Sequence, residues 1–291
     1  MRIVAWNCAM ALHRKIDALM ALRPDLAVIS EAAEPGRLLD RAPALAEASL
    51  VWVGRNPHKG LLLAGFGTTR LEINRRRHDG RLHWMAPVAV SGLPGLDQPV
   101  HLLGVWAQNA SEGNLQKNNP GFLQRALRRY RRFLSSAPAV VAGDFNNHVR
   151  WDRPGWRMNH ANEIRALARL GLVSAYHVSR GVEAGNELEP TFYWRRRAVD
   201  GYHIDYVFMP EEWSTCAFDL TVGLYEEWIG PGLSDHVPLV LEITPPRCMQ
   251  GKKQPHVPAV DSVAPASAKR GADNDSMPLL SCPGAYASKP S

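Results

Sequence analysis

The sequence predicts an α/β fold in which two packed β-sheets are flanked by helices. Hydrophobic residues make up 45% and charged residues 21% of the 291 positions, as is typical of a globular domain with a sizeable core. Short apolar runs of strand length dominate the chain, and only three stretches have helical periodicity. Many strands with few helices between them favour packed sheets with the helices outside.

The apolar runs have the length and the turn-rich boundaries of β-strands. In chain order they are Ile3–Trp6, Leu26–Ser30, Leu61–Phe66, Trp84–Val90, Val100–Ala107, Ala139–Ala142, Ile204–Met209 and Pro238–Ile243. No internal repeat and no linker interrupts them, so we expect a single domain over residues 1–244.

The predicted helices are recognised by their apolar periodicity and by their end signals. They are His13–Leu22, Pro120–Leu134 and His160–Leu170. In the second helix, Asn119 stands at the N-cap and Pro120 at the first helical position. Gly171 follows the third helix as a natural C-terminal cap.

Residues 245–291 differ in composition from the rest of the chain. They are rich in Pro, Ala, Ser and Lys and have no periodicity. Such a segment cannot bury enough apolar surface to offset its ordering entropy, so we predict a disordered tail. A partner-binding or localisation segment is the alternative.

The overall charge and the cysteines restrict the partners and the compartment. A net charge of +6 and a pI near 9.3 favour anionic partners such as phosphorylated metabolites, nucleic acid or an acidic surface. The four cysteines form no CxxC pair and have no zinc-type spacing, which fits a reducing cytoplasm. Neither a signal peptide nor a membrane-spanning run is visible, and we expect a cytoplasmic monomer without membrane contact.

A carboxylate and an amide follow the predicted strand Ala139–Ala142. Asp144 and Asn146 are two positions apart, so an extended chain would point both side chains the same way. One group could then take a proton from water while the other orients that water. The alternative is an ordinary strand end with an Asx-turn.

Two histidines lie next to aspartates near the end of the domain. His203 and Asp205 would share one face of an apolar strand, where a carboxylate needs a partner; an edge strand with a solvated polar face is the alternative. Asp235 and His236 follow a Gly/Pro loop, a plausible place for phosphate contact or proton transfer, although a lone histidine is more often structural.

Near the N-terminus, Asn7 closes the first predicted strand and Glu31 the second. An acid at the carboxyl end of an apolar strand is well placed to hold a hard cation. Mg²⁺ prefers one or two carboxylates together with water and phosphate oxygens. A solvent-facing glutamate at a strand end is the alternative.

The ordered set of these segments resembles the endonuclease/exonuclease/phosphatase superfamily. The resemblance covers about residues 1–243. It depends on Trp6-Asn7, Glu31, Lys59-Gly60, Gly143-Asp144-Phe145-Asn146, Thr191-Phe192-Tyr193-Trp194, Ile204-Asp205-Tyr206 and Ser234-Asp235-His236-Val237-Pro238. It implies a four-layered sandwich of two mixed β-sheets flanked by helices.

The resemblance also implies a role for each matching residue. Glu31 is expected to be the principal ligand of Mg²⁺ or Mn²⁺, with Asn7 and Asp235 close by. Asp144 would deprotonate or position the attacking water. The remaining implied catalytic residues are Asn146, which would orient that water, His236, which would contact the scissile phosphate, and Asp205, which would pair with His236.

The segment Val105–Asn109 departs from the family pattern. Exonuclease III-like members carry Tyr-x-Pro-Asn at the matching place; here Asn109 is retained as a catalytic candidate, but Trp106 replaces the tyrosine and Gln108 the proline. Trp106 is either a core residue or a stacking surface for a base or sugar. His203 stands where an arginine is common in the family. We treat Trp106 and His203 as substrate-binding candidates.

Arginines gather on the polar side of the helix predicted over Pro120–Leu134. Arg128 belongs to this group and is a candidate for binding phosphates, with a solvated helix surface as the alternative. These basic residues favour a metal-dependent nuclease acting on DNA or RNA. A phosphatase or phosphodiesterase for a small metabolite or lipid head group is the second hypothesis, and a non-catalytic nucleic-acid-binding protein is the third.

Overall fold

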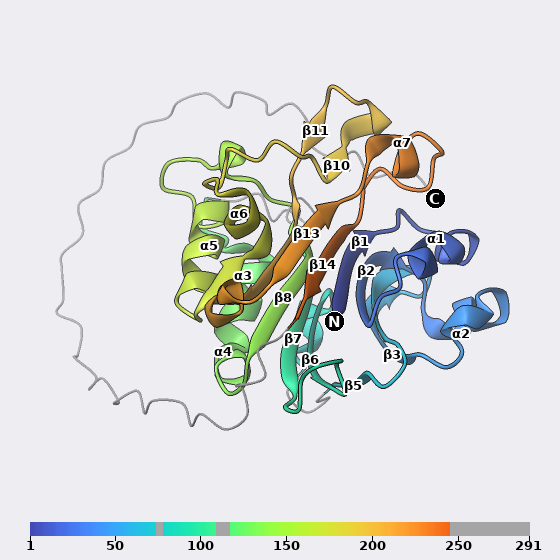
Figure 1. Cartoon of the computed structure of the whole chain (residues 1–291). Helices are drawn as coiled ribbons and strands as arrows, with labels where there is room; N and C mark the ends of the chain where they lie inside the picture. The colour runs from blue at the N-terminus through green and yellow to red at the C-terminus, as the bar shows by residue number, and fades with distance from the viewer. Residues whose placement is uncertain (74–77, 109–116, 245–291) are drawn as a thin grey trace. The chain divides into compact units, whose positions relative to one another are not determined.

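The computed structural model describes residues 1–73, 78–108 and 117–244. Within them the chain forms two six-stranded sheets flanked by helices, which confirms the predicted fold class (Figure 1). Asn109 and the predicted tail lie outside the described residues. None of the described helices has the length and apolarity needed to cross a membrane.

The first sheet has the strand order β13-β14-β1-β2-β4-β3. Its strands are β1 (Arg2–Asn7), β2 (Leu26–Ala32), β3 (Ser49–Asn56), β4 (Lys59–Gly65), β13 (Phe218–Val222) and β14 (Leu239–Ile243). The second sheet has the order β5-β6-β7-β8-β12-β9. Its strands are β5 (Arg70–Ile73), β6 (Met85–Ser91), β7 (Val100–Trp106), β8 (Ala139–Asp144), β9 (Leu172–Ser174) and β12 (Asp205–Pro210).

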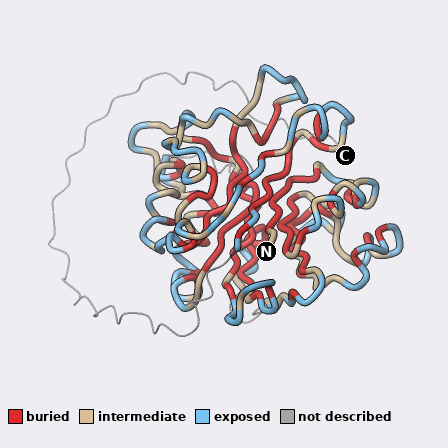
Figure 2. The backbone as a smooth tube through the Cα atoms, in the orientation of Figure 1, coloured by how far each residue is buried: buried red, intermediate tan, exposed pale blue. Residues whose placement is uncertain are grey.

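Both sheets are mixed, with one parallel pair at the centre of each. β1 runs parallel to β2, and β7 runs parallel to β8, whereas the other neighbours are antiparallel. The central strands of the two sheets contact each other, and Figure 2 shows the buried backbone concentrated there. A short hairpin of β10 (Phe192–Tyr193) and β11 (Gly201–Tyr202) stands apart from both sheets.

Helices form the outer layers of the sandwich (Figure 1). They are α1 (Ile16–Ala21), α2 (Pro35–Leu38), α3 (Gly121–Arg129), α4 (Arg131–Leu134), α5 (His160–Ala168), α6 (Ala175–Arg180) and α7 (Tyr225–Trp228). α3 contacts β6, α4 contacts β7, and α5 and α6 contact β9, so these helices cover the second sheet. Short 3₁₀ turns connect several of the elements.

The predicted elements are present with shifted ends. The helix predicted over Pro120–Leu134 is divided at Tyr130 into α3 and α4, and Asn119 does not cap it as predicted: the N-cap is Pro120. Asn119 instead accepts a hydrogen bond from the backbone of Gly121. The edge strands β3, β5, β9 and β13 were not predicted, because they are short or half-exposed and mix polar with apolar residues.

Strand register brings polar residues to one edge of the sandwich. Asp144 at the end of β8 is opposite both Trp106 of β7 and Asp205 at the start of β12. In the other sheet, Asn7 ends β1 and Glu31 lies near the end of β2. Because β1 and β2 contact β8 across the interface, strand ends from both sheets meet at this edge.

Candidate active site

Asp144 is fixed at this edge by the glycine before it. Gly143 has φ +132°, and a Cβ at this position would lie 2.0 Å from the carbonyl oxygen of Val105 on β7. Only glycine tolerates both this backbone conformation and this approach. The close pairing of β7 and β8 therefore depends on Gly143 and leaves the side chain of Asp144 almost fully buried at the strand end.

Asp144 and Asn146 meet, although not by the predicted extended geometry. Asn146 has φ +49°, so the chain turns after Asp144 instead of continuing as a strand. The backbone N–H of Asn146 donates to Asp144 Oδ1 at 2.8 Å, and its side-chain Nδ2 donates to Oδ2 at 3.1 Å. A left-handed backbone at a non-glycine residue is a costly conformation that is concentrated at functional sites.

His236 is paired with Asp205. Its Nδ1 lies 2.8 Å from Asp205 Oδ2, and both side chains are buried. The hydroxyl oxygen of Thr191 accepts the backbone N–H groups of Ile204 and Asp205, each at 3.0 Å, and so fixes the start of β12. The ring of Phe192 lies 4.7 Å from that of His236.

The first sheet holds the backbone of His236. Trp6 Nε1 donates to the carbonyl oxygen of His236 at 3.0 Å. Ser234 Oγ accepts the N–H of His236 at 3.1 Å and donates to the carbonyl oxygen of Asn7 at 2.7 Å. His236 therefore bridges the two sheets: its backbone is bonded to β1 and its ring to β12.

Asp144, Asp205 and His236 form one electrostatic unit. Each offers one ligand-type atom, and these atoms lie within 4.8 Å of one another. Burial, together with the Asp205 carboxylate, raises the pKa of Asp144 above its ordinary value. Burial alone would lower the pKa of His236, but the neighbouring Asp205 and Asp144 outweigh it and raise that pKa, which favours the imidazolium form.

Glu31 lies in a β-bulge instead of closing its strand. The register between β2 and β4 shifts between Ser30 and Ala32, and Glu31 has φ +62°. A bulge of this kind redirects one side chain. Glu31 Oε1 lies 3.5 Å from Asn7 Nδ2, and its Oε2 lies 3.1 Å from Lys59 Nζ.

Asn7 connects Glu31 of the first sheet with Asp144 of the second. Its Nδ2 also donates to Asp144 Oδ2 at 3.0 Å, so one amide faces carboxylates from both sheets. Asp235 is half-buried, and its carboxylate interacts electrostatically with His236 and with Lys15. Lys15 also interacts with Glu31, so Asp235 and Glu31 approach the same cation.

The side chains at this edge suit a hard divalent cation. Glu31, Asn7 and Asp235 offer carboxylate and amide oxygens, the donors that Mg²⁺ and Mn²⁺ prefer. Asp205 Oδ1 is buried with no hydrogen-bond partner among the described residues, so oxygen lone pairs remain unused beside them. The residues present therefore fit such an ion.

Of the three predicted substrate-binding residues, two are buried and one is exposed. Trp106 is 2% exposed, and its ring packs against Trp84 at 6.1 Å, which favours the core alternative. His203 is also 2% exposed, and its Nδ1 donates to the carbonyl oxygen of Glu189 at 2.7 Å. Burial lowers the pKa of His203 to about 4, so a neutral, buried ring of this kind does not support a contact with substrate. Arg128 is exposed on α3.

Two positioning residues and two cations were not assigned roles from the sequence. Thr191 and Ser234 lie inside quoted motifs, and their hydroxyls organise Asp205 and His236. Lys59 also belongs to a quoted motif, and its pairing with Glu31 requires the β2–β4 register. No sequence pattern indicated a role for Lys15. Its half-buried ammonium is held by the backbone carbonyl of Met10 in the loop that follows β1.

Similarity to solved structures identifies this fold. The chain is similar to the 3'-5' exonuclease of Neisseria meningitidis, with 17% identity, a TM-score of 0.60 and coverage of 84% of this chain and 99% of that one. It is similar to an AP endonuclease from Archaeoglobus fulgidus at 18% identity and TM-score 0.58, over 84% and 99% of the two chains. An endonuclease/exonuclease/phosphatase from Beutenbergia cavernae matches at 19% identity and TM-score 0.51, over 84% and 71%.

The chain has the endonuclease/exonuclease/phosphatase fold. No protein-family model and no curated protein sequence matches it. At these identities the likeness concerns the endonuclease/exonuclease/phosphatase fold alone.

Proposed function

We propose that this protein is a Mg²⁺- or Mn²⁺-dependent phosphoesterase that hydrolyses phosphodiester bonds of nucleic acid. The observation that carries the proposal is the buried unit of Asp144, Asp205 and His236 beside the Glu31 carboxylate and the Asn7 amide. The names of similar structures agree with this class: an exonuclease, an AP endonuclease and a 3' phosphatase bound to a DNA hairpin.

Glu31 would be the principal metal ligand, supported by Asn7 and Asp235. When bound, the ion would supply charge that neutralises phosphate oxygens and the leaving oxygen. Lys59, 3.1 Å from Glu31, adds positive charge on the same side. The left-handed backbone at Glu31 supports this role, since it holds the carboxylate at the edge shared by the two sheets.

Asp144 would accept a proton from the attacking water. A carboxylate with a raised pKa is a better base than an exposed one, and its position within the sandwich limits competing bulk water. Asn7 and Asn146 both donate to Asp144 Oδ2, which fixes the orientation of the carboxylate. The side chain of Asn146, half-buried beside Asp144, would orient the water.

His236 would stabilise charge on the scissile phosphate. Asp205 accepts Nδ1–H of the ring, which leaves Nε2–H of the imidazolium as the donor for a phosphate oxygen. Preorganised donors of this kind contribute about 3–4 kcal/mol to the stabilisation of a transition state. The contacts of Thr191 and Ser234 would preserve that orientation.

Substrate assays with and without a chelator test this proposal. Purified protein is incubated with single-stranded, duplex, abasic-site and 3'-phosphate oligonucleotides, and with a panel of phosphorylated metabolites. We expect oligonucleotide hydrolysis that is lost in EDTA and restored by Mg²⁺ or Mn²⁺. Release of phosphate from metabolites alone would replace the nuclease assignment with the small-phosphoester hypothesis.

A matched pair of variants assigns any activity to the site. Asp144→Asn should reduce kcat by about 1000-fold, equivalent to about 4 kcal/mol, because the base is lost while the shape is retained. Asp219→Asn removes an exposed carboxylate on β13 and should change kcat less than twofold. Equal activity of Asp144→Asn and wild type would contradict the proposed mechanism.

A further inference from the structure

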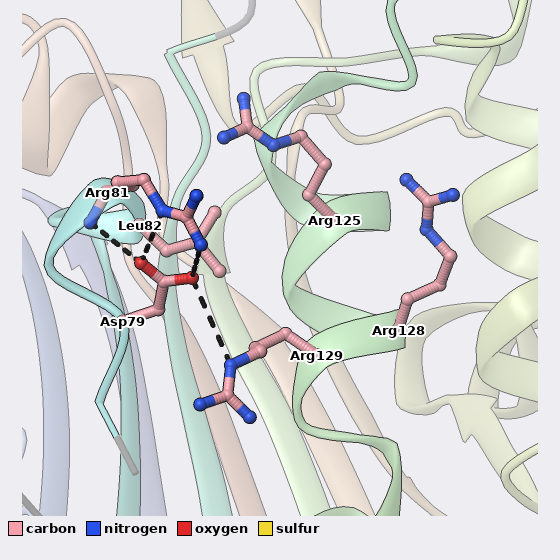
Figure 3. A pocket seen from close by; sticks show the side chains of 6 residues that line it. All are labelled: Asp79, Arg81, Leu82, Arg125, Arg128 and Arg129. Carbon is pink, nitrogen blue, oxygen red and sulfur yellow. Dashed lines mark hydrogen bonds and ion pairs between the residues drawn. The ribbon is translucent and has the colours of Figure 1, made fainter. Parts of the chain in front are cut away.

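Four arginines surround a hollow on the outer face of the second sheet. The hollow has a volume of about 250 Å³ and lies between the 3₁₀ turn η4 (Gly80–Leu82) and α3. We call it the arginine hollow; it is lined by Asp79, Arg81, Leu82, Arg125, Arg128 and Arg129 (Figure 3). It is separate from the unit of Asp144, Asp205 and His236, and no step proposed above uses it.

The single carboxylate of the arginine hollow is already engaged. Asp79 Oδ1 accepts the backbone N–H and the Nε–H of Arg81, each at 3.0 Å, and Asp79 Oδ2 accepts Nη2–H at 2.9 Å. Arg129 Nε lies 3.9 Å from the same carboxylate (Figure 3). One carboxylate faces four guanidinium groups, so the lining carries a net charge of +3.

Arg125 and Arg128 supply the uncompensated charge. Neither has an ion pair with any acid in the part of the chain that the structure describes. Arg125 lies over the ring of Phe122, with 5.2 Å from Cζ to the ring centroid, so its guanidinium is held in place. Closely spaced cations without acidic partners repel one another, and an anion with several acceptor oxygens relieves that repulsion.

A chain of aromatic rings connects the arginine hollow with the edge that carries Asp144. Trp106 is the strand partner of Asp144. Its ring lies 6.1 Å from that of Trp84, which lies 4.9 Å from the ring of Phe122 beneath Arg125. These contacts place the hollow next to the aromatic layer at the end of β7 that pairs with Asp144. Phosphates of a nucleic-acid strand recur about every 3.4 Å along a helix axis, so a flank of several nucleotides could reach both places.

We propose that the arginine hollow binds a backbone phosphate of the nucleic-acid substrate, several nucleotides from the bond that is hydrolysed. Arg125 and Arg128 provide the main contacts, and Arg81 and Arg129 add charge from either side of Asp79. The inference rests on the proposed function, since it assigns the hollow to the same substrate.

Binding without turnover tests the inference separately from the proposed function. Arg125→Gln/Arg128→Gln is compared with Arg131→Gln/Arg132→Gln, which removes two exposed charges from the adjoining α4, outside the hollow. Fluorescence anisotropy with a labelled 20-nucleotide strand and with a dinucleotide is measured in EDTA over a series of salt concentrations. Inorganic phosphate is included as a competitor.

We expect the variant in the hollow to bind the 20-nucleotide strand at least about tenfold more weakly at low salt. Its slope of log affinity against log salt should fall by about one to two, and the dinucleotide should be affected less. The α4 variant should bind within about threefold of wild type. Equal losses in both variants, or equal losses for both oligonucleotides, would overturn the inference.

The remaining outcomes are equally decisive. Two results together would assign the hollow to a free phosphate and overturn the inference. Inorganic phosphate at millimolar concentration would compete fully, and the hollow variant would bind the strand with wild-type affinity. If the wild type binds but does not hydrolyse nucleic acid, and the hollow variant binds weakly, the proposed function fails while the phosphate contact stands. If the wild type hydrolyses nucleic acid and the hollow variant binds normally, the inference alone fails.

Discussion

Two of the buried histidine–carboxylate groups among the described residues differ in what their carboxylate oxygens do. In the first, His236 is paired with Asp205 at the edge where the two sheets meet. In the second, His148 and His177 donate to the two oxygens of Glu187, at 3.1 and 2.9 Å. All five side chains are buried or mostly so.

Each oxygen of the Glu187 carboxylate already accepts two hydrogen bonds. Besides the two histidines, both of its oxygens accept the backbone N–H of Gly185 at 2.9–3.0 Å. Burial opposes ionisation of Glu187, but the hydrogen bonds from His148 and His177 outweigh it and hold its pKa well below the ordinary value. This group cross-links the segment after α6 to the turn η6 (Val149–Trp151) that follows the loop after Asp144.

Asp205 differs because half of its carboxylate is unused. Its Oδ1 has no hydrogen-bond partner among the described residues, and a second carboxylate, Asp144, lies beside it. A saturated carboxylate stabilises a fold, whereas one with free lone pairs and a charged neighbour can bind a further group. A histidine–carboxylate pair therefore indicates a site only when its hydrogen-bonding capacity is incomplete.

The largest expected difference between the two groups is in catalysis. His236→Ala should lower kcat by about 100- to 1000-fold, because the donor for the phosphate oxygen is lost. His177→Ala removes a mostly buried histidine of the second group and should change kcat less than about threefold. The measurement is oligonucleotide hydrolysis, normalised to folded protein by circular dichroism. Similar losses in both variants would mean that the distinction between the groups is wrong.

The next expected difference is in stability. Glu187→Gln should reduce the free energy of unfolding by about 2 kcal/mol, because one amide oxygen cannot replace two carboxylate oxygens that accept three N–H groups. Urea unfolding followed by tryptophan fluorescence measures it. Asp219→Asn serves as the control and should change the free energy of unfolding little. A Glu187→Gln protein as stable as this control would show that the cross-link does not stabilise the fold.

The smallest expected effect is a pH dependence that originates at His160, whose ring is hydrogen-bonded to Glu163 and interacts electrostatically with Glu187. Burial lowers the pKa of His160 from 6.5 to about 3, so this ring stays neutral in the folded protein. The unfolded chain binds a proton below pH 6.5, so this stabilisation is present above that pH and is lost as the pH falls toward 3. The loss should reach about 1.4 kcal/mol per pH unit.

Urea unfolding at about pH 7, 6 and 5 measures this loss, and His160→Gln should flatten it. The lowered pKa of Glu187 adds a loss only below its ordinary value of 4.5. The shifted pKa values of His203, Glu163 and Asp144 also contribute between pH 6.5 and 4.5, so the difference in slope between wild type and His160→Gln reports His160. A variant with the same slope as wild type in that window would assign the acid sensitivity to another group.

Much of the fold could be predicted because its central strands are continuous apolar runs. Runs such as Ala139–Ala142 and Leu26–Ser30 are buried on both faces, so burial itself leaves a signal in the sequence. The edge strands β3 and β13 gave no such signal, since their residues are partly exposed and pairing with a neighbour decides their conformation.

The sequence by itself determined the central strands, the resemblance to the superfamily and the set of polar residues near the strand ends. Only the tertiary structure decided how these residues are used. The bulge at Glu31, the turn at Asn146 and the burial of Trp106 and His203 depend on strands that are distant in the chain. The partner of His236 is Asp205, 31 residues away, because sheet register and packing set that distance and local sequence does not.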